Sequence, residues 1–195
     1  MNIKINGSGL PKGPKYLKVS LPKNLKKAWP DLPKPSSVSF DETLGFGTNL
    51  SPILHDYNIQ KHEKILDIGA FKNEMVETIQ SKGFYNAAGI DINPEILRSP
   101  YGIQINFRDL RLNEKYRVIH FNWVLDHFPG GLFNKEKKPS LQLFANKISL
   151  HLLPKGYLIF RDVSDNAPKF KECLLNIGFK HIREQDEYIY VFQKP

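Results

Sequence analysis

A chain of 195 residues is long enough for one well-packed domain and short for two. Its apolar fraction of 41% and charged fraction of 25% are those of a globular protein, which excludes a wholly disordered chain. No apolar run approaches the roughly 20 residues that cross a bilayer, and no apolar segment of a secretory signal follows the amino terminus. With Cys173 as its single cysteine, we expect a cytoplasmic protein that has no disulfide and does not contact a membrane.

The formal charge of +8 is concentrated at the start of the chain. Residues 1–38 contain eight lysines and six prolines but only one acid, Asp31, so they carry a net charge of +7. Because proline removes backbone donors and breaks helices, we expect an extended basic arm over residues 1–48 and one domain over residues 49–195. Such an arm either attracts nucleic acid or another polyanion, or docks on the domain through apolar residues such as Trp29 and Leu32.

Beyond the arm, short apolar strands alternate with helical segments. A helix is predicted from about residue 51 to residue 60, with Pro52 in its first turn. The strands are predicted at 64–68, 87–91, 103–107, 118–122 and 157–162, and the helical segments at 74–82, 94–97, 125–128, 140–152 and 167–176. This alternation is typical of a doubly wound α/β fold, in which helices cover both faces of a mostly parallel sheet.

The end of the chain follows a different pattern. Gly178 ends the last helix, and two further strands are predicted at 179–184 and 188–193. The three residues between them are too few for a parallel crossover connection, so these strands must form an antiparallel hairpin.

One strand-turn-helix segment has the position of a ligand site. Gly69 lies in the turn after the first strand, where doubly wound sheets hold nucleotide-like ligands against a helix amino terminus. Asp91 follows 22 positions later at the end of the second strand, where a carboxylate can accept hydrogen bonds from ribose hydroxyls. Asp67 is charged within an otherwise apolar strand, so it is expected either to contact the ligand or to anchor the turn.

Residues 60–195 resemble the class I S-adenosylmethionine-dependent methyltransferases. The resemblance rests on Ile65-Leu-Asp-Ile-Gly, Gly89-Ile-Asp, Phe107-Arg-Asp-Leu and the segments 118–128 and 153–162. It implies a seven-stranded sheet that ends in the hairpin, with S-adenosylmethionine as the cofactor. The cofactor-binding residues that we expect are Asp67, Gly69, Phe71, Asp91, Ile92, Asp109, Leu110 and Asn122.

The turn departs from the family pattern at two positions. Phe71 and Asn73 stand where the family usually has glycines, which serve there for unusual backbone angles and close approach. Phe71 is therefore expected either to form a wall of the cofactor site or to pack outward.

Polar residues after the fourth strand are the candidates for the acceptor side. Trp123, Asp126 and His127 lie where the strand ends, and a histidine beside an acid can supply a general base. We take Asp126 and His127 as the catalytic candidates, against the alternative that they only pack or touch the cofactor. No cysteine-histidine cluster has metal-ligand spacing, so no metal is expected.

Together these patterns predict a methyltransferase that acts on a small molecule. Three alternatives remain: an RNA or protein acceptor held by the basic arm, a non-catalytic partner subunit, and a lyase or cyclase that uses the same cofactor. The sequence leaves the oligomeric state open.

Overall fold

A computed structural model describes residues 44–109, 115–128, 140–185 and 188–195. Most of the expected arm, residues 1–43, lies outside this part of the chain. No helix in the described part is long and apolar enough to span a membrane.

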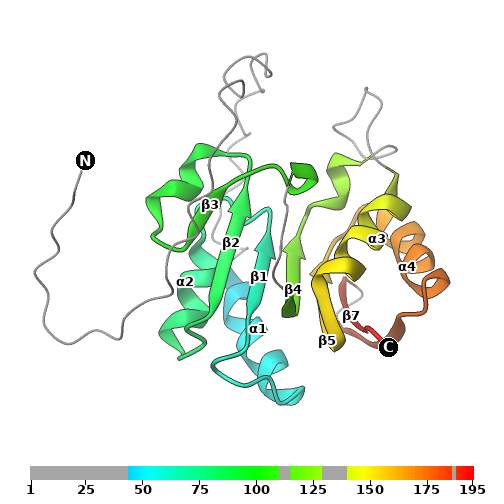
Figure 1. Cartoon of the computed structure of the whole chain (residues 1–195), viewed down its shortest axis with the longest axis horizontal. Helices are drawn as coiled ribbons and strands as arrows, with labels where there is room; N and C mark the ends of the chain where they lie inside the picture. The colour runs from blue at the N-terminus through cyan, green and yellow to red at the C-terminus, as the bar shows by residue number, and fades with distance from the viewer. Residues whose placement is uncertain (1–43, 110–114, 129–139, 186–187) are drawn as a thin grey trace, which may run out of the picture. The chain divides into compact units, whose positions relative to one another are not determined.

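The described strands form one seven-stranded sheet in the order β3-β2-β1-β4-β5-β7-β6 (Figure 1). Its parallel strands are β1 (Ile65–Ile68), β2 (Ala87–Asp91), β3 (Gly102–Gln104), β4 (Tyr116–Asn122) and β5 (Leu152–Arg161). The hairpin of β6 (Lys180–Gln185) and β7 (Ile189–Gln193) is antiparallel, and β7 pairs with β5. The predicted doubly wound fold, including its antiparallel end, is confirmed.

Helices cover both faces of this sheet (Figure 1). One apolar cluster joins α1 (Leu44–Asp56) and α2 (Glu74–Ser81) to alternate strand residues such as Ile65 and Val118. The other joins α3 (Leu141–His151) and α4 (Asn166–Asn176) to the intervening residues, such as Leu66 and Ile119. Successive strand side chains point to opposite faces, so buried parallel strands are apolar on both. Within the described residues, three short 3₁₀ helices follow β2, β3 and β4, namely η3 (Pro94–Arg98), η4 (Phe107–Asp109) and η5 (Leu125–His127).

Three elements differ clearly from the sequence-based expectation. The strand predicted at 157–162 is β5, which begins at Leu152 and ends at Arg161. The first helix begins at Leu44 and ends at Asp56, so Pro52 lies inside it rather than in its first turn. It ends early because Asn58 adopts a left-handed φ of 54°, which no α-helix can continue. The third strand ends at Gln104, since Phe107 turns into η4 and packs edge-on against Phe144, with 5.0 Å between ring centroids.

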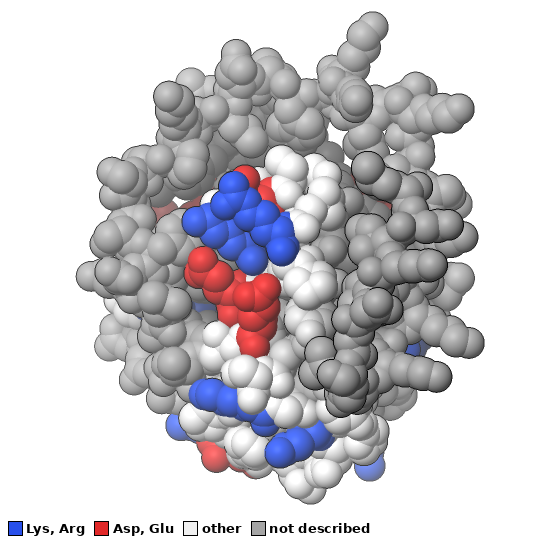
Figure 2. All heavy atoms as spheres, turned by 90° about the vertical axis from the view of Figure 1, so that its left-hand side faces the viewer, with Lys and Arg blue, Asp and Glu red and all other residues white. Residues whose placement is uncertain are grey.

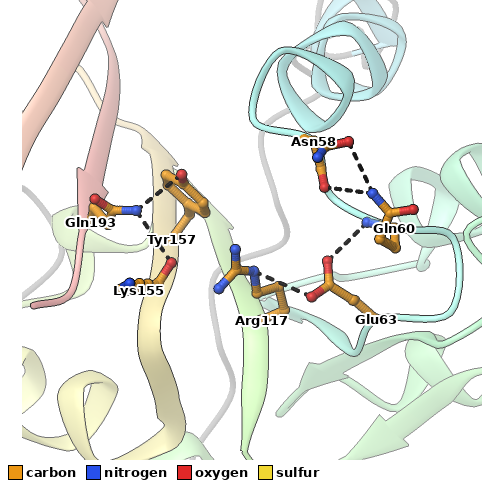
Figure 3. Close-up of polar contacts among 7 residues, drawn as sticks. All are labelled: Asn58, Gln60, Glu63, Arg117, Lys155, Tyr157 and Gln193. Atoms are coloured by element: carbon orange, nitrogen blue, oxygen red, sulfur yellow. Dashed lines mark hydrogen bonds and ion pairs between the residues drawn. The ribbon is translucent and has the colours of Figure 1, made fainter.

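The amino-terminal edge of the parallel strands is held by polar contacts (Figure 3). Arg117 Nε on β4 lies 3.3 Å from Glu63 Oε1, and the Arg117 guanidinium lies 5.5 Å from the ring centroid of Tyr157 on β5. Gln193 on β7 donates a hydrogen bond of 3.0 Å to the Tyr157 hydroxyl. These contacts join the turn after α1 to three strands, at the edge opposite the predicted ligand-binding residues.

Candidate functional site

The carboxyl-terminal edge of three adjacent strands gathers the predicted residues. Gly69 follows β1, Asp91 ends β2 and Asn122 ends β4, and β1 lies between the other two strands. Parallel strands end at the same edge, so the topology brings these positions together. Leu110 lies outside the described residues.

The first turn, residues 69–73, is fixed to the end of β2. The N–H groups of Gly69 and Ala70 both donate to the Ile90 carbonyl, at 2.8 and 3.1 Å. Gly69 has a φ of 76°, and a Cβ atom there would stand 2.8 Å from Val124 Cγ2. The angle and the contact both favour glycine at this position.

Phe71 and Asn73 keep the backbone shape that glycine usually provides. Their φ angles are 46° and 69°, both in the left-handed region. A side chain in this region costs about 1–2 kcal/mol, and asparagine tolerates it best after glycine. The turn thus keeps positive φ angles at two positions that carry side chains.

Asp91 presents a carboxylate held by two backbone donors. Its Oδ2 accepts from the Phe71 N–H at 2.8 Å, and its Oδ1 accepts from the Asn93 N–H at 2.7 Å. A carboxylate has about four acceptor positions. Two therefore remain for ligand hydroxyls, on a group whose direction is already set.

The other predicted cofactor residues differ in exposure. Ile92 is exposed beside Asp91, and Asp109 is exposed in η4. Among the described residues, Asn122 Oδ1 is a buried acceptor that has no hydrogen-bond partner. Such an atom suits a ligand N–H or ammonium group.

Asp67 has a partner within the sheet. It is 4% exposed, and its Oδ1 lies 2.7 Å from Nδ1 of His120, its register neighbour on β4. Burial raises the pKa of Asp67, and the adjacent His120 opposes that shift. The residue thus ties β1 to β4, and its contact with a ligand stays a prediction.

The acceptor-side candidates lie on and just before η5. Trp123 is exposed, with a left-handed φ of 58°. Asp126 is buried and His127 is exposed. Burial raises the pKa of Asp126, and the negative charge of Asp162 adds to the shift. This turn therefore offers a carboxyl group with raised proton affinity beside an accessible imidazole.

Two buried residues that the sequence did not single out hold this turn from both sides. Asp162 Oδ2 accepts from the Leu125 N–H at 2.9 Å, and Asn166 Nδ2 donates to the Leu125 carbonyl at 3.0 Å. Asp162 is the last residue of segment 153–162, which resembles the methyltransferases. That resemblance was the only sign in the sequence that this position could matter. Its partner on η5 could not be read from the sequence, because the two residues are 37 positions apart.

No known family model matches the chain, and no curated protein matches it in sequence. Solved structures with the same fold include the N-methyltransferase NodS from Bradyrhizobium japonicum WM9 in complex with S-adenosylhomocysteine. That structure is 15% identical with a TM-score of 0.60, and the match covers 78% of this chain and 87% of NodS.

Two further structures match similarly. Magnesium protoporphyrin IX methyltransferase from Synechocystis PCC 6803 with bound S-adenosylmethionine is 14% identical with a TM-score of 0.57, covering 83% of this chain and 87% of that one. A ribosomal protein methylase from Lactobacillus delbrueckii is 14% identical with a TM-score of 0.56, covering 77% and 79%. At this level of identity the shared property is the fold. The chain thus has the Rossmann-like fold of the S-adenosylmethionine-dependent methyltransferases.

Proposed function

We propose that this chain binds S-adenosylmethionine at the carboxyl ends of β1, β2 and β4 and transfers its methyl group to a small molecule. The observation that carries the proposal is the Asp91 carboxylate. It stands next to the first turn, fixed by the N–H groups of Phe71 and Asn93, with acceptor capacity left for two ribose hydroxyls.

The residues around Asp91 fit the rest of this cofactor. The buried Asn122 Oδ1, which has no partner among the described residues, suits the ammonium group of the methionine part. Exposed Ile92 offers an apolar surface beside the ribose position. NodS with S-adenosylhomocysteine and the protoporphyrin enzyme with S-adenosylmethionine support the same cofactor for this fold. The resemblance assigns the adenine side to Asp109 and Leu110.

When bound, S-adenosylmethionine supplies an electrophilic methyl group on its sulfonium. The protein has to align an acceptor lone pair with that methyl group and exclude water. As the new bond to the acceptor forms, the bond from carbon to sulfur breaks, and an acceptor with an N–H or O–H group then loses a proton. Asp126 and His127 are the groups that we assign to receive it. A carboxylate of raised pKa accepts a proton better than an ordinary one.

The charges on one face of the described residues support a small acceptor over a nucleic acid at that face. Figure 2 views the molecule from the left-hand side of Figure 1 and shows acidic side chains directly beside basic ones. The first turn of α2 carries Glu74 and Glu77, and Glu95 pairs with Arg98 in η3 at 2.9 Å. Nucleic-acid sites require a stripe of positive charge. The basic residues 1–38 remain the feature that favours the RNA or protein alternative.

Calorimetry with S-adenosylmethionine tests the proposal. We expect micromolar affinity, about −7 to −8 kcal/mol, and at least a tenfold loss in Asp91→Asn, because one oxygen that accepts from a hydroxyl is replaced by a donor. Glu95→Gln removes a nearby charge outside the site and should bind normally. If the wild-type chain releases no heat at millimolar ligand, the non-catalytic alternative holds. A product other than S-adenosylhomocysteine would indicate lyase or cyclase chemistry.

A further inference from the structure

Asn73 makes a contact that a glycine at this position could not make. It is 0% exposed, and its Nδ2 donates a hydrogen bond of 2.9 Å to Ser99 Oγ. Ser99 is buried too and follows η3, the short helix after β2. The side chain of Asn73 thus links the start of α2 to the segment between β2 and β3.

The path of this link crosses β2 at Gly89. A Cβ atom on Gly89 would lie 1.8 Å from Asn73 Oδ1, so the amide fills the space that any other residue 89 would occupy. That oxygen is buried and has no hydrogen-bond partner among the described residues. Burying an unpaired acceptor costs about 1–3 kcal/mol. Because this unpaired oxygen lowers the stability of the fold, we expect the Asn73 side chain to have a compensating role.

The first turn that Asn73 restrains also contains the backbone donor to Asp91. Asn73 ends this turn and Phe71 lies two residues before it, so a displaced Asn73 moves the Phe71 N–H. That N–H is the donor to Asp91 Oδ2 at 2.8 Å. Ser99 is therefore connected to the Asp91 carboxylate through Asn73 and the backbone of the turn.

We propose that Asn73, packed over Gly89, and its hydrogen-bond partner Ser99 are positioning residues that set the first turn and the Asp91 carboxylate for S-adenosylmethionine. This inference rests on the proposed function. In a glycine-rich turn the backbone adopts left-handed angles freely but has no side chain to restrain it. Here asparagine provides the left-handed angle and a side-chain restraint at once.

A double-mutant cycle read by calorimetry with S-adenosylmethionine tests the inference. Ser99→Ala and Asn73→Gly should each weaken binding about five- to tenfold. The affinity of the double variant should be no lower than that of the single variant with the lower affinity. Ser99→Thr keeps the hydroxyl and should restore binding. The matched control is Ser81→Ala, which removes an exposed hydroxyl that donates to Thr78 O on α2.

A second readout needs no ligand. Amide hydrogen exchange at Phe71 should become at least tenfold faster in Ser99→Ala and stay unchanged in Ser81→Ala. Normal affinity in every variant, with only a lower melting temperature, would show that the contact merely stabilises the fold and would overturn the inference. Additive losses in the cycle would also overturn it. If the wild-type chain does not bind S-adenosylmethionine, the proposed function is wrong too. If it binds normally and the variants do as well, only the positioning role is wrong.

Discussion

Phe71 combines a strained backbone with a half-buried aromatic ring. Its φ is 46°, the Lys72 ammonium lies 5.6 Å from its ring centroid, and neither apolar cluster of the described residues includes it. Replacing a core phenylalanine by alanine costs about 3–5 kcal/mol. We predict that Phe71→Ala costs less than about 1 kcal/mol of unfolding free energy but weakens S-adenosylmethionine binding several-fold. Urea denaturation and calorimetry measure the two effects, and lost stability with unchanged affinity would refute the ligand contact.

Asp126 should make stability depend on pH. Its folded-state pKa is raised above the ordinary 3.8, so the folded state binds more protons than the unfolded state between the two values. The unfolding free energy therefore falls as pH rises from about 4 through the folded pKa. Asp126→Asn removes this loss, so its stability relative to wild type should increase with pH across that range.

Urea denaturation at several pH values measures this difference. Glu172→Gln, which removes a charge from an exposed residue of α4, serves as the control. If the unfolding free energies of Asp126→Asn and wild type change with pH in parallel, the pKa of Asp126 is not raised in the folded state.

At the scale of elements, η5 depends on the two residues that hold Leu125. Asp162→Asn places a donor where Leu125 or Ser164 needs an acceptor, since Asp162 accepts from both N–H groups at 2.9 Å. We predict a loss of about 1–3 kcal/mol in unfolding free energy, together with faster amide exchange over residues 124–127. Glu172→Gln is again the control. Unchanged exchange at Leu125 in Asp162→Asn would contradict this role.

The sequence predicted the elements that local patterns determine. The strand at 87–91 matches β2, and the helix at 74–82 matches α2 within one residue, because apolar spacing and flanking polar residues mark both. The first helix was misplaced because Pro52 suggested a first turn, whereas the helix tolerates it in its interior. The length of the third strand was overestimated because the alternation of apolar and polar residues over 103–107 does not show where strand pairing stops.

The candidate site was predictable only in part. Gly69 and Asp91 follow from the spacing of strand ends, which the topology brings to one edge. The pairs Asn73–Ser99 and Asp67–His120 were missed because they depend on strand register and packing between distant positions. Whether the named residues bind a ligand stays a prediction.

At the scale of the whole molecule, the basic residues 1–38 are the feature that connects charge to function. We predict that deleting them impairs acceptor turnover with little dependence on salt, because the apolar residues spaced along them, such as Trp29 and Leu32, suit docking on a protein surface better than binding to a polyanion. Turnover measured at two salt concentrations checks this. Salt-sensitive RNA binding that is lost on deletion would favour the polyanion role instead. Full activity of the truncated chain would exclude both roles.

The most direct test of the account is a crystal structure of the full chain with S-adenosylhomocysteine. The account predicts the ligand between the first turn and the end of β2, with its ribose hydroxyls within about 3 Å of the Asp91 carboxylate and its amino group at Asn122 Oδ1. The absence of ligand from this edge of the sheet at saturating concentration, or a ligand bound away from Asp91, would contradict it.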